Sequence, residues 1–236
     1  MHNQSPCLQA AGRLDCLMPQ AMSILALLWI IWCALHSLLI TEQAQTWIAR
    51  QNNWLTGTYR IFYIFFSLLT LIPIIIYQYS FPQKVLFAWH GWWRLPQLLL
   101  LSYAFVMFWQ GSKNYDVAYF LGIRQWRNQQ NGQTAPPLEF RCQGIGLYVR
   151  HPWYSGGLAL LWAVGPITDI NLTSRLILSA YLFIGTLLEE RKLRHQLGEP
   201  YQQYCQHVPM LFPWKGRVSI TVPDQKQTKK KERNLL

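Results

Sequence analysis

The sequence predicts an all-α, polytopic membrane protein with about five transmembrane helices. Of its 236 residues, 51% are hydrophobic and only 13% are charged, which is about half the charged share of a soluble domain. Aromatic residues make up 15%, as is typical of proteins with aromatic belts at the two membrane interfaces. Apolar runs of close to 20 residues, the length that crosses a bilayer, recur along the chain. We therefore expect one membrane domain over 21–213, an N-terminal extension over 1–20 and a polybasic tail over 214–236.

The apolar runs lie near residues 21–40, 59–79, 94–110, 153–169 and 173–189. Of the 21 Lys and Arg residues, 17 fall in one set of alternate loops and 4 in the other. Because Lys and Arg accumulate in cytoplasmic loops, we expect the 111–152 loop and the C-terminus to be cytoplasmic. The basic tail is expected to meet anionic membrane lipids. Nucleic acid is not expected as a partner, since the aromatic residues lie in the spans and not beside these charges.

The fourth and fifth runs are predicted to form a helical hairpin. Pro152 suits the first turn of a helix and holds His151 in an extended conformation, so we expect a helix over 152–168. A polar turn over 169–172 then leads into a return helix capped by residue 173 or 174. Each leg has roughly 17 residues, or about 26 Å.

This hairpin returns an acidic pair to the level of a basic turn. Glu189 and Glu190 are expected at the depth of Arg150 and His151, and ionisable groups at the mouth of membrane helices usually mark a site. Arg150 and the adjacent helix N-terminus favour a carboxylate, while either glutamate can take an ammonium group or the hydroxyls of a ribose. Flat faces for an adenine ring or a sulfonium cation are offered by Tyr148, Trp153 and Tyr154.

Together these groups fit S-adenosylmethionine. The Gly144-x-Gly146 and Gly156-Gly157 pairs are expected to let a ligand approach the backbone. The alternative interpretation is that the basic residues are interfacial anchors and that the glutamates form surface ion pairs.

The ordered motifs of the C-terminal half resemble the isoprenylcysteine carboxyl methyltransferase superfamily. They are Gly146-x-Tyr-x-Arg-His-Pro-x-Tyr-x-Gly156, the Glu189-Glu190 pair, Gly198-Glu-x-Tyr-x-x-Tyr204 and Val208-Pro-Met-Leu-Phe-Pro213. Three earlier segments look like the NnrU and bacterial methanethiol S-methyltransferase branch: His36-Ser-Leu-Leu, Tyr59-Arg-Ile-Phe-Tyr63 and Asp116-x-x-x-Phe-Leu-Gly-Ile-Arg-Gln125.

The resemblance implies an enzyme of a bacterial inner membrane, without a Rossmann sheet, that binds S-adenosylmethionine at its cytosolic face. It implies methylation of a small lipophilic or volatile acceptor, a thiol of the methanethiol type. The alternatives are a lipid-attached carboxylate or amine as acceptor, or a non-catalytic accessory protein of the NnrU kind. A strand-like segment over 144–149 and a covering stretch over 201–213 are implied beside the cofactor. The implied cofactor-binding residues are Gly146, Tyr148, Arg150, His151, Tyr154, Glu189 and Glu190.

A thiol must lose its proton before it attacks, and a positive site lowers its pKa. Arg150 and Arg60 can supply this positive charge, and His36 or Asp116 can accept the proton of the thiol. A helix-end histidine with satisfied hydrogen bonds is the simpler interpretation of His36. Tyr59 and Asp116 are assigned to the acceptor. No metal is expected, because no two of the six histidines lie three or four residues apart.

The charge asymmetry predicts which loops a membrane-impermeant thiol reagent reaches. In a variant without the five native cysteines, a cysteine at position 225 should be protected in intact cells and one at position 170 should be labelled. Labelling after permeabilisation serves as the control. The reverse pattern would mean that a span has been miscounted.

Overall fold

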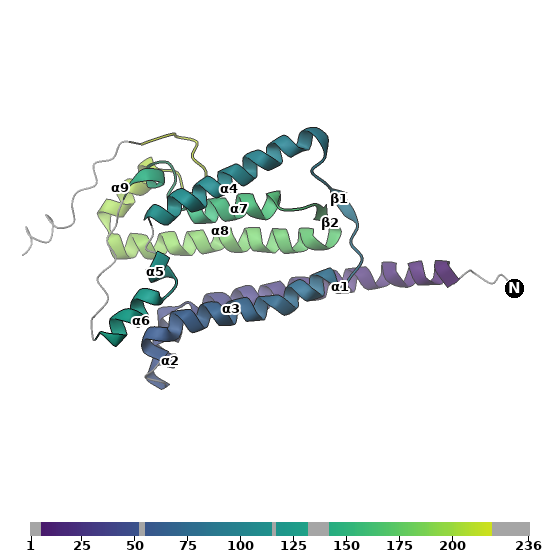
Figure 1. Cartoon of the computed structure of the whole chain (residues 1–236), viewed down its shortest axis with the longest axis horizontal. Coiled ribbons are helices and arrows are strands. Elements are labelled where there is room, and N and C mark those ends of the chain that lie inside the picture. Colours follow the sequence, from purple (N-terminus) through teal and green to yellow (C-terminus); the bar gives the residue numbers. More distant parts are fainter. Residues whose placement is uncertain (1–5, 52–54, 115–116, 132–141, 219–236) are drawn as a thin grey trace, which may run out of the picture. The chain divides into compact units, whose positions relative to one another are not determined.

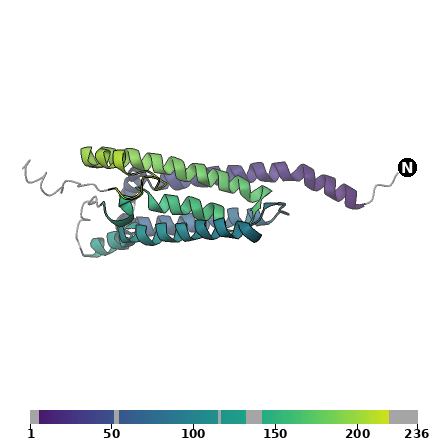
Figure 2. The same cartoon turned by 90° about the horizontal axis from the view of Figure 1, so that it is seen from above.

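The chain is nearly all helical in this computed structural model (Figures 1 and 2). The structure describes all residues except 1–5, 52–54, 115–116, 132–141 and 219–236. The longer helices are α1 (Pro6–Leu39), α3 (Leu55–Tyr79), α4 (Arg94–Asn114) and α8 (Asp169–Leu197). The shorter helices are α2 (Glu42–Gln51), α5 (Val117–Phe120), α6 (Ile123–Gln130), α7 (Pro152–Ala163) and α9 (Glu199–His207). Two 3₁₀ turns, η1 (Gly91–Trp93) and η2 (Gly144–Leu147), and two short strands, β1 (Val85–Phe87) and β2 (Ile167–Thr168), complete the described elements.

The chain divides into two compact units. Unit 1 comprises Met1–Trp92, Ala118–Ala135 and Gly165–Tyr181, and unit 2 comprises Trp93–Val117, Pro136–Val164 and Leu182–Leu236. The long helix α8 therefore contributes its first half to unit 1 and its second half to unit 2.

Three helical segments of the described chain are long and apolar enough to cross a membrane: Met18–Leu39, Thr58–Tyr79 and Asp169–Leu197. They confirm the runs expected at 21–40, 59–79 and 173–189. The expected 94–110 run is helical as part of α4. The expected fourth leg is shorter than predicted, because α7 has 12 residues and ends at Ala163. At 1.5 Å per residue it is about 18 Å long.

The fifth helix begins earlier than the sequence predicted. We expected a polar turn over 169–172, but α8 already starts at Asp169. The reason is a reciprocal cap, in which the Asn171 side chain accepts from the Thr168 amide at 3.0 Å and the Thr168 hydroxyl accepts from the Asn171 amide at 3.2 Å. This is the arrangement of a capping box, with asparagine in place of the usual glutamate.

Unit 1 is held together by a small apolar core and by polar contacts between its long helices. Leu25 and Trp29 of α1 pack with Ile74 of α3 and Ile170 of α8. The Trp29 indole donates to the Ser174 hydroxyl at 2.6 Å, and this hydroxyl donates to the Gln78 side chain, also at 2.6 Å. Hydrogen bonds between helices satisfy polar groups that apolar surroundings would otherwise penalise.

The two strands join loops that are far apart in the sequence. Within unit 1, β1 pairs antiparallel with β2, with Val85 opposite Thr168 and Phe87 opposite Ile167. The segment between α3 and α4 therefore lies beside the segment between α7 and α8 (Figure 1).

In unit 2, α7 runs alongside α4 because two glycines allow a close approach (Figures 1 and 2). A Cβ atom on Gly156 would lie 3.0 Å from the Met107 Cβ and 3.2 Å from the Ala104 carbonyl oxygen. A Cβ atom on Gly111 would lie 2.5 Å from the Trp153 indole. Gly156 was expected to let a ligand approach the backbone; it is buried, and it makes room for a neighbouring helix instead.

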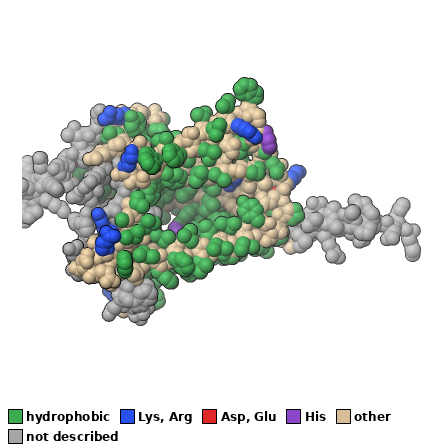
Figure 3. All heavy atoms as spheres, in the orientation of Figure 1, with side chains coloured by type: hydrophobic (Ala, Val, Ile, Leu, Met, Phe, Trp, Pro, Cys, Tyr) green, Lys and Arg blue, Asp and Glu red, His purple; other side chains and the backbone are tan. Residues whose placement is uncertain are grey.

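Large apolar side chains cover the outward faces of α3 and α4, each within its own unit (Figure 3). Examples are Phe65 at 64% exposure and Ile76 at 61% on α3, and Leu99 at 71% on α4. Such surfaces suit a lipid environment. Ile170 is only 2% exposed, so the exposed Pro166 is the better position for the outward reporter of the labelling experiment.

Candidate functional site

The Arg150-His151 turn in unit 2 is held by the segment that follows α9. Its backbone amides donate to the carbonyl oxygens of Pro209 and Met210 at 3.0 and 3.1 Å. We call residues 208–213 the strap. The expected strand-like segment before the turn is instead the 3₁₀ helix η2, and α7 begins at Pro152 as predicted.

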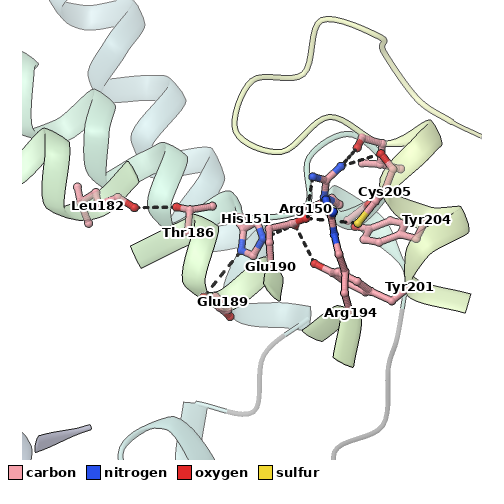
Figure 4. Close-up of polar contacts among 12 residues, drawn as sticks. Arg150, His151, Leu182, Thr186, Glu189, Glu190, Arg194, Tyr201, Tyr204 and Cys205 are labelled. Atoms are coloured by element: carbon pink, nitrogen blue, oxygen red, sulfur yellow. Dashed lines mark hydrogen bonds and ion pairs between the residues drawn. The ribbon is translucent and has the colours of Figure 1, made fainter. Parts of the chain in front are cut away.

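The Glu190 carboxylate is the centre of the polar cluster that this turn enters (Figure 4). Arg150 donates to both of its oxygens, from Nε at 2.8 Å and from Nη2 at 3.0 Å. The His151 Nε2 lies 2.8 Å from Oε1. Three further donors come from Arg194 at 3.2 Å, the Tyr201 hydroxyl at 2.9 Å and the Cys205 thiol at 3.3 Å. The expected meeting of the basic turn and the acidic pair is thereby confirmed.

The cluster is buried, so its charges must be balanced locally. The side chains of Glu190, Arg150 and His151 are 4%, 7% and 1% exposed. Burial and the neighbouring carboxylate raise the pKa of the Tyr201 phenol, and burial raises the pKa of the Cys205 thiol. Both groups therefore keep their protons at neutral pH and serve as hydrogen-bond donors.

Arg150 also fixes the end of α9. Its Nη1 donates to the Cys205 carbonyl at 2.9 Å and to the Val208 carbonyl, so the cation caps the C-terminal end of this helix. The Tyr204 hydroxyl donates to the Gly146 carbonyl at 2.6 Å and ties α9 to η2. The guanidinium that was expected to hold a ligand carboxylate is thus bound on several sides by the protein itself.

Glu189 is far more exposed than Glu190, although both face His151. Its side chain is 34% exposed, and its Oε2 lies 3.9 Å from the His151 Nδ1. That Nδ1 atom is buried and has no hydrogen-bond partner in the described part of the chain. Because Nε2 faces a carboxylate, which only accepts, we place the ring proton on Nε2 and a lone pair on Nδ1. A buried imidazole acceptor and a solvent-reachable carboxylate therefore adjoin each other.

Of the other expected cofactor residues, Tyr154 contacts His151. The Tyr154 ring stands edge-on to His151 at 5.8 Å between ring centres. It also covers Gly185 of α8, where a Cβ atom would lie 3.5 Å from the ring. Tyr148 is 36% exposed. Gly146 is buried and engaged by Tyr204.

The residues expected to act on the acceptor belong to unit 1. The His36 ring is satisfied at both nitrogens, with the Tyr63 hydroxyl 2.7 Å from Nε2 and the Ser67 hydroxyl 3.2 Å from Nδ1. Tyr59 donates to the Leu39 carbonyl at 2.7 Å.

Arg60 packs against Gly122 of the segment before α6, where a Cβ atom would lie 2.8 Å from the Arg60 Cβ. Asp116 lies outside the described residues.

Sequence reasoning placed Tyr201 and Cys205 within the covering stretch over 201–213 but did not single them out as partners of Glu190. One usable signal was present, because Tyr201 and Tyr204 are three residues apart and so share one face of a helix. Both are buried in a common apolar group with Val208. The contact between Cys205 and Glu190 depends on the packing of α9 against α8, which no local pattern reveals.

Comparisons with known proteins agree with the motif analysis. Residues 24–214 match the family described as NnrU protein. The methanethiol S-methyltransferase 1 of Bradyrhizobium diazoefficiens is 27% identical over 211 residues, which cover 84% of this chain and 69% of that protein. The methanethiol S-methyltransferase of Crocosphaera subtropica is 27% identical over 80% of this chain and 73% of its own length. The protein of the same name from Pseudomonas sp. strain GM41(2012) is 27% identical over 83% of this chain and 74% of its own length. No solved structure matches this chain.

The contrast between the two adjacent glutamates predicts different effects on stability. Glu190→Gln removes the charge that balances Arg150 while preserving the side-chain shape, and breaking a buried ion pair in this way costs about 3–5 kcal/mol. Glu189→Gln, at a partly exposed position, should change the free energy of unfolding by less than about 0.5 kcal/mol. Thermal unfolding in detergent measures both. Equal unfolding temperatures for the two variants would show that Glu190 is not a structural centre.

Proposed function

The chain belongs to the NnrU family, and from this premise we propose that it is a membrane methyltransferase that uses S-adenosylmethionine to methylate a small thiol. The shared name of the three relatives supports methanethiol as the acceptor. The apolar surfaces of the helices support a membrane location, which we take to be a bacterial inner membrane, and an acceptor that partitions into lipid.

The observation that carries the cofactor assignment is the buried His151 Nδ1 beside Glu189. Nδ1 offers a lone pair without a hydrogen-bond partner in the described chain, and Glu189 offers a negative charge 3.9 Å away. An ammonium group has three N–H donors and a positive charge, so it satisfies both at once. The methionine part of S-adenosylmethionine carries such a group.

The neighbouring aromatic side chains fit the rest of the cofactor. Tyr154 and the exposed Tyr148 present ring faces that attract a sulfonium cation or stack with adenine. Glu190, Arg150 and Tyr201 hold His151 in place and fix its tautomer through Nε2. We therefore assign Glu189 and His151 to ligand binding and Glu190 and Arg150 to positioning them.

When bound, the cofactor supplies an electrophilic methyl carbon: a thiolate sulfur forms a bond to it while its bond to the sulfonium sulfur breaks, leaving a neutral thioether on each side. The protein's contribution is to orient the reactants, to exclude water and to favour the thiolate over the thiol. We propose that Arg60 supplies positive charge for this last purpose. His36 is not assigned as the base, because both of its ring nitrogens are already engaged.

We further propose that the chain crosses the membrane five times, with α4 and the short α7 as the third and fourth legs and the C-terminus in the cytoplasm. The pairing of β1 with β2 supports this topology. The pairing requires the loop before α4 and the loop after α7 to lie on the same side of the membrane. This is expected if α4 and α7 cross the membrane in opposite directions. The uneven distribution of Lys and Arg supports the orientation.

The activity is tested with purified protein, methyl-labelled S-adenosylmethionine and methanethiol. We expect label in a volatile thioether. Glu189→Gln should weaken binding of S-adenosylhomocysteine at least about tenfold, the usual effect of losing a charged partner. Glu199→Gln, which changes an exposed glutamate of α9, is the matched control and should bind normally.

Other results would reject this function. Labelled lipid without a volatile product would indicate a lipid methyltransferase. Cofactor binding without transfer to any acceptor would favour an accessory protein, and absence of cofactor binding by the wild type would exclude a methyltransferase.

The need for a thiolate predicts a pH dependence. Methylation of methanethiol should rise with pH until the bound thiol is ionised. A nearby cation lowers the pKa of the bound thiol, so Arg60→Ala should move the midpoint of the pH–rate profile to higher pH while the plateau rate changes little. Arg60→Lys retains the charge and should keep the midpoint. If the midpoint stays in place in the alanine variant, Arg60 does not act on the acceptor.

A further inference from the structure

A hollow in unit 2 adjoins the cluster around Glu190. It has a volume of about 220 Å³ and is lined by Leu187, Glu190, Arg191, Arg194 and Met210. A single water molecule needs about 10–15 Å³, so the hollow admits a group of several heavy atoms. Four of its five lining residues come from α8 at spacings of three or four, which places them on one face of that helix.

This face is not the one that carries Glu189. At about 100° per residue, Arg191 lies about 160° around α8 from Glu189, and Arg194 lies about 140° away. The group that is held between Glu189 and His151 therefore lies on the opposite side of α8 from both arginines. This leaves the hollow open to a second ligand.

The charge of the hollow favours an anion. Arg191 is exposed, and the Arg194 side chain is 53% exposed while one of its donors is held by Glu190 at 3.2 Å. The Glu190 carboxylate in the hollow already accepts from Arg150, His151, Tyr201 and Cys205 besides Arg194. A single carboxylate that is shared with Arg150 does not neutralise the two arginines of the hollow. Arginine pairs of this kind suit the oxygens of a phosphate.

The same face of α8 continues directly into an apolar stripe. Phe183, Ile184, Leu187 and Leu188 are 47%, 53%, 46% and 59% exposed, and Arg191 and Arg194 follow them within two turns. An exposed apolar stripe that ends in arginines matches the transition from acyl chains to head groups at a membrane surface.

We propose that this hollow binds the phosphate of an anionic phospholipid, with Arg191 and Arg194 on the phosphate oxygens. The acyl chains lie along the 183–188 stripe of α8, and Met210 of the strap closes the opposite side of the hollow. The lipid thus contacts the strap and the helix that carries Glu190.

The test uses the full chain, purified in detergent and freed of lipid. Phosphatidylglycerol is titrated while thermal unfolding is followed, and native mass spectrometry counts the lipids retained. Each arginine should contribute about fivefold to the affinity, so Arg191→Gln should weaken binding about fivefold and the double variant with Arg194→Gln about 30-fold. Lys192→Gln is the matched control, since it removes an equal charge from the same helix but does not line the hollow; it should bind within about twofold of the wild type.

Two ligands separate the possible sources of the anion. Phosphatidylcholine has the same chains without a net charge, and inorganic phosphate has the charge without chains; both should bind at least about tenfold more weakly than phosphatidylglycerol. Equal binding of phosphatidylglycerol by the wild type and by Arg191→Gln would overturn the proposal. So would a loss of S-adenosylhomocysteine binding with unchanged lipid binding, which would assign the arginines to the cofactor. Within the described chain, the Arg191 side chain makes no hydrogen bond or ion pair with the buried cluster, so its variant tests the site even if Arg194→Gln impairs folding.

Discussion

The fold around the candidate site depends on balancing one buried negative charge. A carboxylate removed from water loses several kcal/mol of hydration, and only close cations and hydrogen-bond donors restore that loss. Glu190 recovers it from the turn before α7, from its own helix and from α9. Because these donors come from separate segments, satisfying the charge also brings the segments together. Arg150 extends the effect to the strap through the carbonyl groups at the end of α9.

This arrangement explains how two identical neighbouring side chains acquire different roles. Consecutive residues on a helix point about 100° apart, so one glutamate of the pair faces the packed interior while the other remains accessible. Glu190 and Arg150 then form a supporting pair, and we assign Glu189 and the Nδ1 nitrogen of His151 to the part that meets a ligand. A supporting layer of hydrogen bonds that fixes the tautomer of a binding histidine is a common requirement for a precise site.

Polar groups inside the apolar helices of unit 1 follow the same principle with neutral partners. His36, Tyr63 and Ser67 satisfy one another between α1 and α3, and Trp29, Ser174 and Gln78 link α1, α8 and α3. An apolar environment penalises any of these groups left alone. In unit 2, close packing is achieved by small residues instead, since Gly156 and Gly111 allow α7 and α4 to approach.

The sequence by itself determined the features that depend on local chemistry. Apolar runs gave the helical class and three candidate membrane spans, because length and hydropathy are local properties. Pro152 set the start of α7, and the return of the chain through α8 brought the Glu189-Glu190 pair to the Arg150-His151 turn. Tertiary structure decided which glutamate is buried, that α7 ends at Ala163 and that α8 starts at Asp169. It also turned Gly156 from an expected ligand contact into a helix contact. These features depend on contacts between residues distant in the sequence, such as Tyr201 and Cys205 against Glu190, and no periodicity within one segment records which partner it will meet.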